Sequence, residues 1–244
     1  KGFGSNKNKK FNILKKLNKK KIVNIAIKYH SQGNLKLAAK YYSYCIENNI
    51  NDQKVFCNYA VILREEGQLK DAEIILRKFI SINPSSVFAH NNLSGILREL
   101  GKINDAENIL KKSLKIDPNN YKSQYNLGCL LIDLKKYKEA ETILRKSISL
   151  NLSNSDAYLN LGIAMRNLGY LKEAIDLIEK AIELKPDNAL GFLNIGIVYR
   201  ELKNYKLAIE FFYKALNLNK DLLSIKYELI NCKGEICDWK SLGE

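Results

Sequence analysis

The sequence repeats itself every 34 residues, and this period constrains the fold more than any other feature of the chain. An alanine holds the same place in six successive units: Ala38, Ala72, Ala106, Ala140, Ala174 and Ala208. Five residues before each alanine lies a turn position, which is glycine in four units and lysine in two: Gly33, Gly67, Gly101, Lys135, Gly169 and Lys203. A period of this size is the signature of an array of stacked supersecondary units.

Apolar residues within a unit are spaced as in helices. In the third unit one stripe contains Leu93, Ile96, Leu97 and Leu100, and a second stripe begins at Ile103. The glycine region separates the two stripes, so each unit is predicted to be a helix, a tight turn and a second helix. A small residue halfway along the first helix lets the second helix approach closely: Ala26, Ala60, Ser94, Gly128, Gly162 and Gly196.

A 34-residue helical hairpin with these positions resembles the tetratricopeptide repeat, and Ala157 to Asn188 (AYLNLGIAMRNLGYLKEAIDLIEKAIELKPDN) carries the resemblance almost completely. The resemblance implies an all-α, right-handed superhelical solenoid of stacked hairpins. Lys135 and Lys203 depart from the glycine of the family pattern. The expected repeats are 19–52, 53–86, 87–120, 121–154, 155–188 and 189–222.

The two ends of the chain differ from the repeats. The formal net charge is +14, and residues 1–18 are expected to form a basic, flexible tail, because the first 21 residues hold nine lysines and no acid. Such a tail is able to touch nucleic acid or an anionic membrane, but we expect no specific nucleic-acid partner and no membrane span. Residues 223–244 begin like another first helix and are expected to cap the last repeat.

The resemblance also implies which residues line the concave groove, since the first helix of each pair faces it in this family. The sixth residue of every expected repeat is asparagine: Asn24, Asn58, Asn92, Asn126, Asn160 and Asn194. An amide both donates and accepts hydrogen bonds, so a row of them can pair with the backbone of an extended peptide. The alternative is that asparagine is a consensus residue of the repeat that satisfies local backbone groups.

Arginines recur at the twelfth residue of four repeats, at Arg64, Arg98, Arg166 and Arg200. They are candidates for gripping acidic side chains of a bound peptide. Ion pairs within the repeat stack, with the acids at the thirteenth residue, are the interpretation that we favour. The basic residues that a clamp for chaperone tails requires are missing at the fifth position, which disfavours that ligand.

The segment that contains Cys237, Asp238 and Trp239 resembles the junction that follows the repeats in O-linked N-acetylglucosamine transferase and SPINDLY-type proteins. This resemblance implies the substrate-recognition arm of a protein O-glycosyltransferase. The sequence ends at Glu244 without a transferase domain, so we expect no nucleotide-sugar site in this chain.

Sequence motifs for catalysis are missing: there is no phosphate-binding glycine loop, no HExxH, no CxxC and no nucleophile elbow. We therefore predict no enzyme activity, no cofactor and no metal. Five scattered cysteines without an export signal favour a reducing, cytoplasmic location. The predicted function is binding of another protein through an extended segment in the groove. The alternative is a general assembly scaffold that uses the convex surface or the solenoid ends, and the oligomeric state stays open.

Overall fold

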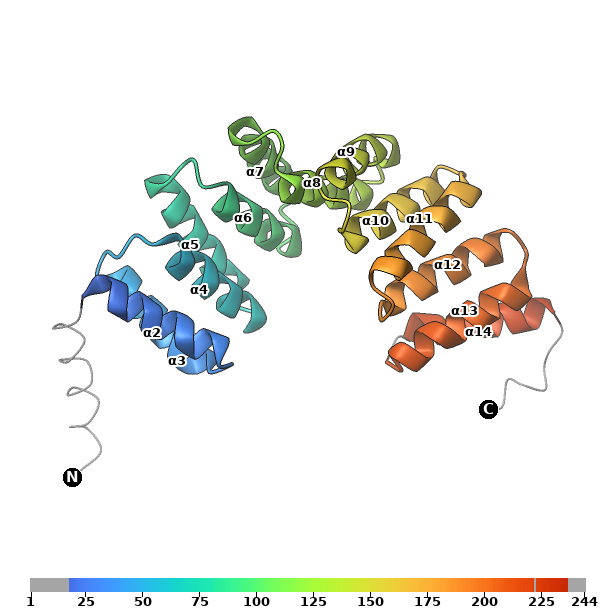
Figure 1. The fold of residues 1–244 in the computed structure, drawn as a ribbon, viewed down its shortest axis with the longest axis horizontal. Helices are drawn as coiled ribbons and strands as arrows, with labels where there is room; N and C mark the ends of the chain where they lie inside the picture. The colour runs from blue at the N-terminus through green and yellow to red at the C-terminus, as the bar shows by residue number, and fades with distance from the viewer. Residues whose placement is uncertain (1–17, 222, 237–244) are drawn as a thin grey trace, which may run out of the picture. The chain divides into compact units, whose positions relative to one another are not determined.

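The structure is a computed structural model that describes residues 18–221 and 223–236 (Figure 1). Within these ranges the regular secondary structure is entirely helical, in thirteen helices. Consecutive helices pair as hairpins, which confirms the predicted all-α solenoid. The expected basic tail lies outside the described residues except for Asn18, and so does the segment 237–244 with its Cys–Asp–Trp element.

Contacts divide the chain into two compact units on either side of Pro118 and Asn119. Unit 1 contains three hairpins, formed by α2 (Lys19–Ser31), α3 (Leu35–Glu47), α4 (Gln53–Glu65), α5 (Leu69–Ile82), α6 (Val87–Glu99) and α7 (Ile103–Ile116). Unit 2 contains three more and a final helix, formed by α8 (Tyr121–Asp133), α9 (Tyr137–Leu150), α10 (Ser155–Asn167), α11 (Leu171–Leu184), α12 (Ala189–Glu201), α13 (Tyr205–Leu218) and α14 (Leu223–Glu235).

Side-chain caps explain why the first helix of each hairpin begins where it does. The residue before the helix is Asn, Asp or Ser, and its side-chain oxygen accepts a hydrogen bond from a backbone N–H of the first turn. This holds for Asn18, Asp52, Ser86, Asn120, Asn154 and Asn188. The link that follows one hairpin therefore also supplies the N-terminal cap of the next hairpin.

The turn inside each hairpin places one residue in the left-handed backbone region. Gly33, Gly67, Gly101 and Gly169 have φ between 71° and 87°, and Lys135 and Lys203 adopt φ of 57° and 60°. The two lysines therefore keep the turn geometry of the glycines, although a Cβ makes this conformation unfavourable.

Each hairpin closes on a small-residue contact. The repeated alanines, which begin with Ala38 and end with Ala208, are all fully buried. Opposite them, a Cβ added to Gly128 would lie 2.5 Å from Leu144, and one added to Gly196 would lie 2.6 Å from Phe212. The predicted close approach of the two helices is confirmed at these glycines.

The first helices of neighbouring hairpins also touch one another within a unit. In unit 1, α4 contacts both α2 and α6, and in unit 2 α10 contacts α8 and α12, while α12 also contacts α14. We call the surface formed by the first helices of a unit its inner face. The second helix of a hairpin packs on the first helix of its own hairpin and also on the first helix of the next, as α3 does on α2 and α4, and α9 on α8 and α10.

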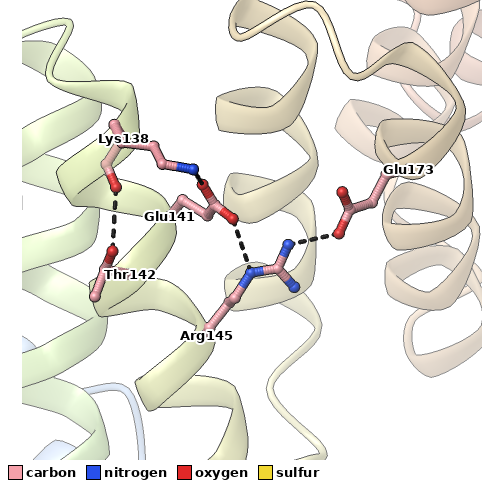
Figure 2. A network of polar contacts seen from close by, with 5 residues as sticks. All are labelled: Lys138, Glu141, Thr142, Arg145 and Glu173. Carbon is pink, nitrogen blue, oxygen red and sulfur yellow. Dashed lines mark hydrogen bonds and ion pairs between the residues drawn. The ribbon is translucent and has the colours of Figure 1, made fainter.

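Ion pairs bridge successive second helices. Arg145 of α9 contacts Glu141 on its own helix at 3.1 Å and Glu173 of α11 at 2.5 Å, while Lys138 also binds Glu141 (Figure 2). Arg77 of α5 repeats this pattern in unit 1, with Glu73 at 2.9 Å and Asp105 of α7 at 3.2 Å. Burial acts to raise the pKa of Glu73, but hydrogen bonds from Lys102 and Arg77 outweigh it and hold that pKa below its ordinary value.

A helix that crosses a bilayer needs about 20 consecutive, predominantly apolar residues. Among the described residues, no helix is both long enough and apolar enough to traverse a membrane.

Candidate functional site

The six asparagines at the sixth position lie in the second turn of the six first helices. Unit 1 carries Asn24, Asn58 and Asn92 on α2, α4 and α6, and unit 2 carries Asn126, Asn160 and Asn194 on α8, α10 and α12. Asn24 is exposed and the other five are half-buried. Each unit thus holds a row of three amides, and the two rows belong to separately described bodies.

Several of these amides donate hydrogen bonds within the chain. Nδ2 of Asn160 donates to the carbonyl oxygen of Asp156 at 2.8 Å and lies 3.4 Å from the Tyr125 hydroxyl. Nδ2 of Asn194 donates to the Leu190 carbonyl oxygen at 2.8 Å. Nδ2 of Asn58 donates to the Tyr42 hydroxyl at 3.1 Å. In these three asparagines the amide nitrogen is therefore the part that holds the side chain in place.

Asn92 contacts the helix before it. Its side chain forms a hydrogen bond with the thiol of Cys57 on α4. Burial raises the pKa of Cys57 to about 12, against the lowering effect of this hydrogen bond. Asn92 and Cys57 are 35 residues apart, as are Asn160 and Tyr125, so the asparagine rows follow the junctions between successive first helices.

These contacts are compatible with both interpretations of the asparagines, peptide binding and a local structural role. The bonds from Asn160 and Asn194 to carbonyl oxygens four residues earlier are the local role expected of a consensus residue. Each of those bonds uses one N–H of the amide. A primary amide has a second N–H and a carbonyl oxygen with two acceptor sites, so it retains capacity for a ligand.

The candidate arginines form ion pairs along the inner face. Arg64 binds Glu99 of the next hairpin at 2.6 Å, and Arg166 approaches Glu201 of the next hairpin at 3.6 Å. Arg200 binds Glu228 of α14 at 2.5 Å. Arg98 lies exposed near the end of α6. The charges of Arg64, Arg166 and Arg200 are thus partly neutralised by acids of the same chain, as the interpretation of intramolecular ion pairs expects.

Asn24 lies in a pocket at the start of unit 1. The pocket has a volume of about 440 Å³, and Val23, Ile27 and Ile50 supply apolar walls. Lys19, Lys20 and Lys54 give its rim a net positive charge over the single acid Asp52. This end of the inner face is therefore suited to an anionic or carboxylate-bearing part of a ligand.

A second row runs beside the asparagines, at the ninth position of each repeat. It consists of Ile27, Val61, Gly95, Cys129, Ile163 and Ile197. Cys129 is buried, and the isoleucines and the valine are half-buried, so their side chains pave the inner face without leaving it entirely. Only Gly95 contributes no side chain to this row.

Metal and thiol chemistry find little support in the part of the chain that the structure describes. No group of three His, Cys, Asp or Glu residues there could hold a metal ion together. Cys45, Cys57, Cys129 and Cys232 are all buried. Burial raises the pKa of Cys45 to about 11, so this thiol stays protonated at neutral pH. His90 is buried, with Nδ1 2.8 Å from the Ser86 carbonyl oxygen.

Sequence reasoning missed the partners of the site residues. Tyr42, Tyr125, Cys57 and Glu228 position the asparagines and Arg200, yet none was a candidate. For Tyr125 and Cys57 the signal lay in the repeat arithmetic: each lies 35 residues, one repeat plus one residue, before the asparagine that it contacts. The ion pairs of Arg64 with Glu99 and of Arg166 with Glu201 have the same separation.

Comparison with protein families identifies the repeats. Family models described as tetratricopeptide repeat match residues 53–86, 97–149, 155–188 and 189–222. Together these stretches cover more than half of the chain. A comparison with curated proteins finds no significant match.

Solved structures with the same fold include YrrB, described as a TPR protein with an unusual peptide-binding site. That match has 24% identity, a TM-score of 0.59, and covers 80% of this chain and 99% of YrrB. A chain of the APC/C hetero-tetramer Cut9–Hcn1 matches at 18% identity and a TM-score of 0.79, over 86% of this chain and 42% of that one. MamA matches at 28% identity and a TM-score of 0.56, over 65% of this chain and 92% of MamA.

Proposed function

Since the chain belongs to the tetratricopeptide repeat family, we propose that it binds another protein by holding an extended segment of that partner on an inner face. The observation that carries the proposal is the asparagine at the same place in all six first helices. In Asn58, Asn160 and Asn194 the described hydrogen bonds all run from Nδ2. Their carbonyl oxygens therefore remain able to accept N–H groups of a ligand backbone.

The spacing of the rows favours an extended segment over a helical one. Packed helices lie about 8–10 Å apart, and a polyproline II segment advances about 9 Å in three residues. Such a segment would present the same side of its backbone to each successive amide. Its backbone groups form no internal hydrogen bonds, so they are open to amide side chains, whereas those of a helix are not.

The ion pairs of the inner-face arginines affect which side chains are available to bind a ligand. Because Arg64, Arg166 and Arg200 already contact acids, they contribute to a ligand only by exchanging one partner for another. Recognition by the amide rows and the apolar ninth-position row depends less on the ligand's charge. YrrB, which shares the fold at 24% identity, is described with a peptide-binding site and supports the proposal only as an example of the fold.

Variants in unit 2 test the proposal. Twelve-residue peptides would be selected on the wild-type protein from a random display library, and their affinities measured by calorimetry. Replacing Asn126, Asn160 and Asn194 with alanine should weaken inner-face binders of unit 2 at least tenfold. The matched control is Asn217→Ala, which removes an exposed asparagine of the second helix α13. A general scaffold that uses the outer surface predicts that the triple variant keeps its affinity.

Two finer proposals come from the sequence. The role of substrate-recognition arm for a protein O-glycosyltransferase depends on Cys237, Asp238 and Trp239, outside the described residues. Reading the gene beyond codon 244 tests it, and an open frame without a transferase domain would remove it. The proposed cytoplasmic location is supported by the buried thiols of the described helices, and cell fractionation tests it. We assign this chain itself no reaction.

A further inference from the structure

Gly95 has no structural reason to be glycine. It lies inside α6 (Val87–Glu99), where glycine is less favourable than alanine because the unfolded chain loses more backbone freedom on folding. A Cβ added at Gly95 would meet no atom within 4 Å. By contrast, a Cβ at Gly128, Gly162 or Gly196 would come within 2.6 Å of the facing helix. Packing therefore requires those three glycines but not Gly95.

Gly95 leaves an opening in the ninth-position row on the inner face of unit 1, because residue 95 has no side chain and an added Cβ would meet no atom there. It occupies the ninth position of its repeat, where Ile27 and Val61 of the same unit project half-buried side chains. It follows Asn92 by three residues, so both lie on the same side of α6. The ninth-position row of unit 1 is thus interrupted at Gly95, beside the amide of Asn92.

Two contacts between α4 and α6 define the ends of this opening. One turn before Gly95, Asn92 binds Cys57, and one turn after it, Glu99 binds Arg64 at 2.6 Å. Val61 lies on α4 between Cys57 and Arg64 and is therefore level with Gly95. The opening has an amide at one end, a neutralised ion pair at the other and an aliphatic side chain across from it.

This subsite would take an apolar side chain. The ion pair of Arg64 and Glu99 leaves no net charge to select an acidic or basic group. Val61 is apolar, and Phe88 at the start of α6 is 44% exposed on the same helix. A bulky aliphatic or aromatic side chain placed in the opening would bury surface from Val61, which is favourable.

We propose that Gly95 creates the specificity subsite of unit 1, in which a bulky apolar side chain of the bound extended segment fills the space between α4 and α6. This inference rests on the proposed function, because Asn58 and Asn92 would hold the backbone of the same segment. The missing side chain at residue 95 then explains the unfavourable glycine: the ligand supplies the group that the other repeats carry themselves.

The test uses the full chain and twelve-residue peptides selected on it from a random display library. Peptides that bind unit 1 are those whose affinity falls when Asn58 and Asn92 are replaced with alanine. Their affinities are then measured for Gly95→Leu, which fills the opening, and for the control Ser81→Leu, which adds the same side chain to an exposed position of α5. Thermal unfolding of Gly95→Leu should occur no lower than that of the wild type.

The expected result is a loss of at least tenfold with Gly95→Leu, none with Ser81→Leu, and a shared large apolar residue in the selected peptides. If peptides depend on Asn58 and Asn92 but bind Gly95→Leu as tightly as the wild type, the subsite is wrong and the proposed function stands. If no selected peptide depends on those asparagines, inner-face binding in unit 1 is itself refuted, and the subsite with it.

Discussion

A Cβ on Gly162 would lie 2.6 Å from Cγ1 of Ile178, on the second helix of the same hairpin, and 3.2 Å from the backbone oxygen of Ala174. Cβ atoms essentially never come as close as 2.6 Å to another heavy atom, so a side chain at residue 162 would force Ile178 to move and crowd the backbone of α11. The same contact recurs at Gly128 and Gly196. The eighth position of a repeat is thus set by packing inside the hairpin, whereas the ninth position, one residue later, lies on the inner face.

Glycine replacements at these two positions should have opposite effects. Gly162→Ala should lower the free energy of unfolding by about 1–3 kcal/mol, because the added methyl group overpacks a closed contact. Gly95→Ala should raise it by up to about 1 kcal/mol, since alanine favours the helix and meets no neighbour. Urea denaturation of the two single variants measures both values. A loss of stability in Gly95→Ala would show that residue 95 is packed after all.

Lys135 and Lys203 offer two stabilising replacements. Both adopt a positive φ that costs a residue with a Cβ about 1–2 kcal/mol. Replacement by glycine removes this cost but adds entropy to the unfolded chain. We expect Lys135→Gly and Lys203→Gly each to raise the free energy of unfolding by about 0.5–1 kcal/mol, measured by urea denaturation.

Gly169 provides the matched control for these turns. Its φ is 87°, so Gly169→Ala places a Cβ in the same unfavourable region and should destabilise the protein by about 1 kcal/mol. If the alanine variant were as stable as the wild type, the turns would tolerate side chains, and the lysine replacements would gain nothing.

The ion pair between Arg145 and Glu173 should contribute little to stability despite its short distance. Both side chains are more than two-fifths exposed, and exposed pairs are worth about 0.2–1 kcal/mol. A double-mutant cycle with Arg145→Ala and Glu173→Ala measures the coupling energy, which should decrease as salt is added. A coupling several times larger and insensitive to salt would mean that the pair is effectively buried.

Buried thiols should make the protein less stable at alkaline pH. The pKa values of Cys45 and Cys57 are raised by burial to about 11 and about 12. In the unfolded chain a thiol loses its proton near pH 8.5, so the unfolded state binds fewer protons above that pH. The free energy of unfolding should therefore be unaffected by these groups below about pH 8.5 and fall as pH rises toward 11–12.

Urea denaturation across pH 8 to 11 measures this slope, with Cys57→Ala as the comparison variant. The slope should be shallower in the variant, because one proton no longer distinguishes the two states. An unchanged slope would assign the alkaline effect to other groups, such as Tyr42, whose pKa burial also raises.

Repetition explains how much of the fold was predictable. The alanines and small residues that recur every 34 positions mark where two helices touch, and such contacts depend on local spacing alone. Lys135 and Lys203 depart from the glycine of the family pattern. In the structure they nevertheless adopt the positive φ of the turn glycines, because the five-residue link to the buried alanine fixes the turn.

Contacts between hairpins were harder to foresee. The ion pair between Arg64 and Glu99 is of the kind that the sequence predicted, but the bond between Asn92 and Cys57 was not predicted, because it depends on how one first helix is offset against the next. The 34-residue period gives the repeat length, but the additional residue that separates contacting positions follows only once the helices are placed. Gly95 was not a candidate for a similar reason. The structure is needed to distinguish a glycine that helix packing requires from a glycine that it does not require.

The most direct test of the central claim is a titration of the ¹⁵N-labelled protein with a library-selected peptide, followed through the side-chain NH₂ resonances of the asparagines. The account predicts that the resonances of Asn58 and Asn92, or of Asn160 and Asn194, shift with peptide concentration, while those of Asn108 and Asn217 on second helices stay in place. Shifts confined to Asn108 and Asn217 would contradict inner-face binding.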